Sequence, residues 1–151
     1  MKKILIVLLL ISFLFTITRC KNLFSGLSEQ ATDKIQNKQL FVAVGSSGET
    51  RYSTDGINWA AGTGASGNLQ CVTYGAGKFV AVGNFGAAYY STDGIKWKSG
   101  AGVSSTLVGI TYGAKKFVAV GASGNTFHST DGINWTAGNN AGGSTLNGVT
   151  Y

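Results

Sequence analysis

The sequence predicts an all-β domain built from repeats of one four-stranded antiparallel unit. The first observation is a period: FVAVG and STDG each occur three times, and each copy starts 38 residues after the previous one. The second is composition, since 23 glycines, no proline and 11% aromatic residues suit short strands joined by tight turns. Third, residues 41–78 and 79–116 share 22 identical positions, so the repeated element is a complete supersecondary unit.

Residues 1–19 are predicted to be an export signal peptide. Lys2 and Lys3 provide a positive start, and an apolar run follows over residues 4–17. This run is short for a membrane-spanning helix, which needs about 20 apolar residues. Without residues 1–19, nine basic residues face six acidic ones, so the net charge is about +3. The remaining cations are scattered, and no basic stripe predicts a nucleic-acid partner.

The end of the signal peptide and the cysteine that follows it read Ile-Thr-Arg-Cys at residues 17–20, which resembles a bacterial lipoprotein signal. In that family a cysteine follows the cleavage point directly and its sulfur is acylated. The resemblance implies lipid attachment at Cys20, and therefore an exported protein anchored to the outer membrane or the cell surface. Arg19 departs from the family, which has a small residue there, and the alternative is a signal peptide without lipid.

Residues 20–38 are expected to hold the lipid-attachment cysteine and a polar tether. This segment lacks the repeat and is rich in polar residues. A tether of this kind would let an anchored domain stand clear of the membrane.

The repeat domain is predicted to span residues 39–151, with four short strands in each unit. In one copy these are Leu107–Tyr112, Lys116–Gly121, Asn125–Ser129 and Ile133–Trp135. The short turns between them predict antiparallel hairpins. A four-stranded meander of about 40 residues is typical of a β-propeller blade.

The strands are offset from the ends of the repeat domain. Residues 39–62 supply strands two to four of a blade, residues 69–100 and 107–138 supply a blade each, and residues 146–151 supply a first strand only. The sum is about three blades, below the usual 4 to 8. The sequence therefore predicts an open arc, a fragment, or half of a ring that a homodimer would close with six blades. The alternative is a β-trefoil, which also has three repeats and twelve strands and closes as a monomer.

The STDG segment has a structural explanation that needs no ligand. Asp93 is expected to accept hydrogen bonds from backbone N–H groups downstream, and Gly94 to adopt the positive φ that closes the hairpin. Ser91 can hold the other side of the turn through its hydroxyl, and Trp97 can bury a large apolar surface. We therefore expect this segment to serve the fold.

The same residues resemble the Asp-box, or BNR, repeat of sialidase-like β-propellers, Ser-x-Asp-x-Gly-x-x-Trp. The resemblance covers residues 40–151 and implies a mainly structural hairpin between the third and fourth strands of each blade. The chain lacks one residue between Asp and Gly. The structural Asp-box residues are Ser53, Asp55, Gly56, Trp59, Ser91, Asp93, Gly94, Trp97, Ser129, Asp131, Gly132 and Trp135.

A sialidase-like or other glycan-processing enzyme is an alternative that the residues disfavour. Glycosidases need two carboxyl groups roughly 5 to 9.5 Å apart, whereas Asp55, Asp93 and Asp131 belong to successive units. Sialidases also hold the substrate carboxylate with an arginine cluster, and Arg51 is the single arginine after residue 19. We therefore predict no catalytic residue, no cofactor and no metal ligand.

Function is expected where the copies differ, on the loop between strands two and three and on the strand that follows. Arg51, Phe85, Tyr89 and Phe127 are the candidate ligand contacts, because aromatic residues and arginine dominate binding hot spots. The prediction is a binding or assembly module whose partner is a protein or a glycan. A truncated remnant of a longer repeat protein is a further alternative.

Overall fold

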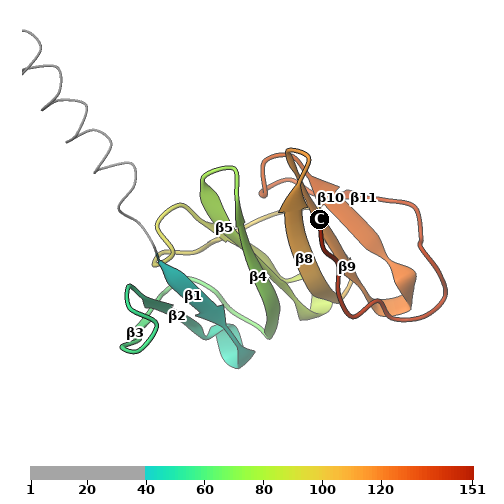
Figure 1. The fold of residues 1–151 in the computed structure, drawn as a ribbon. Helices are drawn as coiled ribbons and strands as arrows, with labels where there is room; N and C mark the ends of the chain where they lie inside the picture. Colours follow the sequence, from blue (N-terminus) through green and yellow to red (C-terminus); the bar gives the residue numbers. More distant parts are fainter. Residues whose placement is uncertain (1–39) are drawn as a thin grey trace, which may run out of the picture. The chain divides into compact units, whose positions relative to one another are not determined.

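The computed structural model describes residues 40–151, which form three antiparallel β-sheets (Figure 1). The predicted all-β class is confirmed, since the other regular elements of these residues are 3₁₀ turns of three residues each. The predicted signal peptide, Cys20 and the tether lie outside the described residues. No helix in the described region is long and apolar enough to cross a membrane.

Each sheet is formed by consecutive strands. The first contains β1 (Phe41–Val44), β2 (Thr50–Ser53) and β3 (Ala60–Ala61). The second contains β4 (Leu69–Gly75), β5 (Lys78–Gly83), β6 (Ala88–Ser91) and β7 (Lys98–Ser99). The third contains β8 (Leu107–Gly113), β9 (Lys116–Gly121), β10 (Thr126–Ser129) and β11 (Thr136–Ala137). The 3₁₀ turns η1 (Ser46–Gly48), η2 (Asn84–Gly86) and η3 (Ala122–Gly124) join the second and third strand of each repeat.

The register of the strands repeats from sheet to sheet. Tyr74 of β4 lies opposite Phe79 of β5, and Tyr112 of β8 lies opposite Phe117 of β9. The ring centroids are 4.8 Å apart in the first pair and 4.7 Å apart in the second. Both hairpins also have a register shift after their first residue, at Leu69 and at Leu107. The 38-residue period therefore specifies pairing and bulge as well as strand positions.

The second and third sheets pack side by side through their first strands. A Cβ atom on Gly75 of β4 would lie 2.1 Å from the ring of Tyr112, so a glycine is needed there for β8 to approach. The fully buried side chains of Val80, Val82, Leu107 and Phe117 belong to β5, β8 and β9. The main core thus joins these two sheets, and these four side chains have identical residues at the equivalent positions of the other repeats.

The predicted strand over residues 146–151 is not formed in the single chain. This segment lies against the third sheet: the Leu146 N–H donates to the carbonyl of Gly121 in β9 at 3.0 Å, and the Tyr151 ring covers Gly113 of β8. Within residues 40–151 the first sheet therefore keeps three strands, and no described strand pairs with the free edge of β1. The expectation that residues 146–151 complete the first sheet fails within one chain because the segment lies against the third sheet.

The fourth strand also differs from its prediction. Ile133–Trp135 was expected to form it, but β11 begins at Thr136. The backbone N–H groups of Ile133 and Asn134 donate to Asp131, so both residues belong to the preceding turn. The β-trefoil alternative does not fit the topology, because a trefoil joins strands of three repeats in one barrel and here each sheet is a separate meander.

Candidate functional site

The three Ser-Asp turns use their polar groups within the turn itself. In the second sheet the Ser91 hydroxyl donates to Asp93 Oδ1 at 2.8 Å and accepts the Gly94 N–H at 2.8 Å. Asp93 Oδ1 also accepts the backbone N–H groups of Ile95 and Lys96, at 2.9 and 2.8 Å. The turns at Asp55 and Asp131 repeat these contacts. The glycine after each Asp has a φ of 71 to 73°, which favours glycine.

These hydrogen bonds lower the pKa of the carboxyl groups. The Asn58 side-chain amide, the N–H groups of Asn58 and Ile57 and the Ser53 hydroxyl all hold the pKa of Asp55 well below its usual range. Burial alone would raise the pKa of Asp131, but the Asn134 and Ile133 N–H groups outweigh it and lower that pKa as well. Both side chains are therefore anionic hydrogen-bond acceptors at neutral pH.

The carboxylates do not gather into a common centre in the described part of the chain. Each belongs to a different sheet and is bound to its own turn. Across residues 40–151, no group of three or more His, Cys, Asp or Glu side chains is placed to hold a metal ion.

Two of the four predicted ligand contacts lie together, and two do not. Phe85 on η2 and Tyr89 on β6 line one surface hollow. Arg51 is exposed on β2 of the first sheet, where its Nε forms an ion pair with Glu49. The prediction for Phe127 was wrong, because this side chain is buried in the core cluster that contains Leu107 and Ala119.

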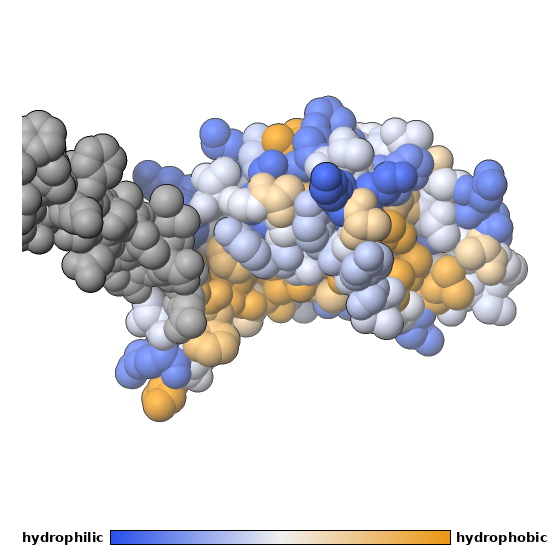
Figure 2. Space-filling view, turned by 45° about the horizontal axis from the view of Figure 1, so that its top comes forward, coloured by the Kyte–Doolittle hydropathy of each residue, from blue (hydrophilic) through white to orange (hydrophobic). Residues whose placement is uncertain are grey.

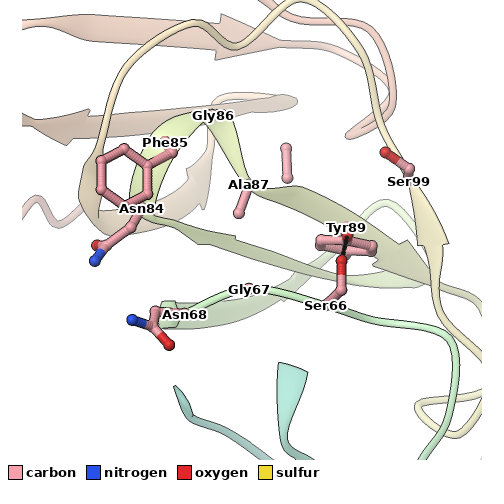
Figure 3. A pocket seen from close by; sticks show the side chains of 10 residues that line it. Ser66, Gly67, Asn68, Asn84, Phe85, Gly86, Ala87, Tyr89 and Ser99 are labelled. Carbon is pink, nitrogen blue, oxygen red and sulfur yellow. Dashed lines mark hydrogen bonds between the residues drawn. The ribbon is translucent and has the colours of Figure 1, made fainter. Parts of the chain in front are cut away.

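The hollow has a volume of about 320 Å³. Its lining comes from the segment between the first two sheets, from η2 and from β6 and β7: Ser66, Gly67, Asn68, Asn84, Phe85, Gly86, Ala87, Ala88, Tyr89 and Ser99. The Ser66 and Tyr89 hydroxyl oxygens are 2.7 Å apart, and Figure 3 shows this contact on the opposite side from the Asn68 and Asn84 amides. No lining residue is charged, so the hollow presents an aromatic face, two amides and several hydroxyls.

Phe85 has an unusual conformation for a large side chain. Its φ is 54°, in the left-handed region, and its side chain is 93% exposed. Ser47 and Ser123 occupy the equivalent positions with φ values of 57° and 55°. The Phe85 N–H donates to Thr106 Oγ1 at 3.2 Å, and the Gly86 N–H donates to the Ser105 carbonyl at 3.1 Å. The next sheet's entry segment therefore fixes the turn that holds Phe85 in solvent.

The sequence alone shows that Phe85 differs from its equivalents in the other copies. Ser47, Phe85 and Ser123 each precede a glycine, and small polar residues occupy the position in two copies. Phenylalanine is the exception, and a bulky residue of this kind rarely adopts a left-handed backbone conformation. Comparison of the copies identifies Phe85 as variable, but the strained conformation needs the structure.

Comparison with known proteins gives a likeness of fold. No family model matches the chain, and no curated protein matches it. One solved structure that resembles it is the crystal structure of the computationally designed Ika8 protein, with a TM-score of 0.57 and 13% sequence identity. The likeness covers 76% of this chain and 38% of the designed chain, so the chain spans well under half of that protein.

Proposed function

We propose that the chain is an exported, membrane-anchored binding module built on Asp-box propeller repeats, and that the hollow beside Phe85 and Tyr89 binds a neutral glycan. The observation that carries this proposal is Phe85 itself. It is held in a left-handed conformation with 93% of its side chain in solvent, where both other copies have serine. Strain of this kind costs on the order of 1–3 kcal/mol and is concentrated at ligand-binding positions.

The chemistry of the lining favours a polyhydroxylated ligand. An aromatic face packs against the C–H surface of a sugar ring, and amides and hydroxyls bind its hydroxyl groups. The Asn84 Oδ1 accepts from Gln70 Nε2 at 3.1 Å, which fixes the orientation of one amide. Because the lining holds no charged side chain, a neutral sugar fits it better than an acidic one.

The anchor rests on the sequence of the first 38 residues. A short apolar run with a positive start supports export, and Cys20 supports lipid attachment. A lipidated binding module would keep its ligand close to the membrane surface to which it is attached.

Phe85→Ser tests the proposal, since serine already occupies this backbone position in the other two copies. We expect the variant to fold normally and to lose at least tenfold in affinity for neutral oligosaccharides, screened on a glycan array and measured by calorimetry. Ser123→Ala is the matched control, because it changes an exposed residue at the equivalent position of the third sheet. Unchanged glycan affinity in Phe85→Ser, or no neutral glycan bound by the unsubstituted protein, would overturn the proposal.

A further inference from the structure

Residues that are buried in the second and third sheets are exposed in the first. The side chain of Phe41 is 54% exposed, whereas the equivalent Phe79 and Phe117 are 8% and 0% exposed. Trp59 is 42% exposed, whereas Trp97 and Trp135 are buried. These side chains belong to the repeat and have the same sequence context in each copy, so the first sheet lacks neighbours that the other two possess.

The free edge of β1 has room for a strand. A Cβ atom on Gly83 would lie 2.0 Å from the Asn68 carbonyl oxygen, and one on Gly121 would lie 2.1 Å from the Thr106 carbonyl oxygen. In both sheets this close neighbour is the backbone entering the first strand. Among residues 40–151, the equivalent Gly45 meets only the Cβ atom of Glu49, at 3.6 Å. The first strand is therefore the neighbour that the first sheet lacks.

Residues 146–151 have the sequence and the position of such a first strand. LNGVTY corresponds to LQCVTY in β4 and to LVGITY in β8. A Cβ atom on Gly113 would lie 1.9 Å from the Tyr151 ring, just as one on Gly75 would meet the Tyr112 ring. The Tyr151 side chain is nevertheless 84% exposed, and it lacks the phenylalanine that Tyr74 and Tyr112 contact across their hairpins. Figure 1 shows this final segment running along the third sheet, near β8 and β9, to the C-terminus.

We infer that residues 146–151 of one copy of this chain pair antiparallel with β1 of a second copy and complete its first sheet. The register follows from β4–β5 and β8–β9. It places Leu146 opposite Gly45, Gly148 opposite Val44, Val149 opposite Ala43, Thr150 opposite Val42 and Tyr151 opposite Phe41. The exchange brings Tyr151 and Phe41 into the ring contact found in the other two sheets, and it pairs an unprotected strand edge.

The contacts between neighbouring sheets also support pairing with a second copy, because they can continue from the third sheet of one chain to the first sheet of another. A Cβ atom on Gly94 would lie 3.1 Å from Val42 of the preceding sheet, and one on Gly132 would lie 2.7 Å from Val80. Continuing this series, Val118 of the third sheet would contact Gly56 of the second copy. Gly56 is exposed in the single chain, whereas Gly94 and Gly132 are buried.

A polar contact between neighbouring sheets can be continued to the second copy in the same way. Lys78 Nζ donates to the Asp131 carbonyl of the next sheet at 2.8 Å. Lys116 occupies the equivalent position in the third sheet and is exposed, so it would reach the Asp55 carbonyl of the second copy. Figure 2 shows apolar residues gathered along the lower side of the described region.

In a pair of copies, residues 146–151 of each chain can pair with β1 of the other. A head-to-tail interface closes into a ring when the rotation at each contact is right, and otherwise it extends into a filament. Two chains of three sheets would give six sheets, within the usual range for a propeller. This arrangement leaves no β1 edge and no 146–151 segment unpaired.

Cysteine cross-linking between two differently tagged full-length chains tests the exchange. One chain carries Phe41→Cys and the other carries Tyr151→Cys, and both are co-expressed and treated with a mild oxidant in membranes. We expect a mixed disulfide-linked dimer on a non-reducing gel. Both substituted side chains are exposed in the single chain, so neither change is expected to prevent folding.

Two controls make the result specific. Tyr74→Cys with Phe79→Cys in one chain has the same register and should form a disulfide within that chain. Thr150→Cys in place of Tyr151→Cys moves the thiol to the opposite face of the strand and should abolish the mixed dimer. A mixed dimer of equal yield with Thr150→Cys, or its absence when the Tyr74–Phe79 control is oxidised, would refute the strand exchange. Glycan binding is measured separately, so failure of either proposal is recognised independently.

Discussion

Ser91→Ala should destabilise the domain far more than its small change in volume suggests. The side chain is buried, and its hydroxyl donates to Asp93 Oδ1 and accepts the Gly94 N–H, both at 2.8 Å. A third hydrogen bond, from the Asp93 N–H, is longer at 3.3 Å. Removing the hydroxyl leaves the N–H group of buried Gly94 without its acceptor.

The expected loss follows from these contacts. An unsatisfied buried donor costs about 1–3 kcal/mol, and a lost hydrogen bond to a charged group adds about 1.5 kcal/mol or more. Asp93 keeps the N–H groups of Ile95 and Lys96, which limits the damage to the turn. We therefore expect the free energy of unfolding to fall by about 2–4 kcal/mol.

Urea unfolding followed by tryptophan fluorescence measures this change, with the m-value serving as a check that the unfolding reaction is the same. Thr92→Ala is the matched control, because Thr92 is the exposed neighbour in the same turn and should change stability by less than about 0.5 kcal/mol. Equal midpoints for Ser91→Ala and Thr92→Ala would refute the role assigned to the Ser91 hydroxyl.

Two further predictions concern acid stability and the anchor. Since the folded pKa values of Asp55 and Asp131 are lowered, their contribution to stability is present above about pH 4 and is lost as the pH falls below it. Urea midpoints should therefore drop between pH 4 and pH 2, and Asp131→Asn should be less stable at pH 7 with a shallower drop; parallel pH profiles would contradict this. Cys20→Ala should release the protein from membranes in cell fractionation, and continued membrane attachment would show that Cys20 carries no anchor.

The repeat made most of the fold predictable. FVAVG recurs with alternating side-chain directions, and the structure has β1, β5 and β9 at those positions. The period also located the hairpin turns, because each Asp-Gly pair can close one locally. The fourth strand was expected to include Ile133–Trp135 but begins at Thr136, since the turn uses the N–H groups of Ile133 and Asn134. A sequence pattern does not reveal which backbone groups a carboxylate has already engaged.

The remaining differences between the sequence predictions and the structure arise from packing between sheets. Arg51, Tyr89 and Phe127 are equivalent in the repeat, yet the first is exposed, the second lines the hollow and the third is buried. Their exposure depends on which sheet or segment covers them, and spacing along the chain carries no such information. Residues 146–151 have the pattern of a strand, but a strand also needs a partner, and residues 40–151 of one chain do not provide it.

The offset between the repeat and the sheets has a consequence for how such a chain can evolve. Within residues 40–151 the first sheet lacks the first strand of the repeat, and residues 146–151 have the sequence of that strand. Duplication or deletion of an internal 38-residue unit would leave both of these ends unchanged. If residues 146–151 pair with β1 of a second copy as proposed, unequal recombination would change the number of sheets per chain while both partners of that contact stay the same.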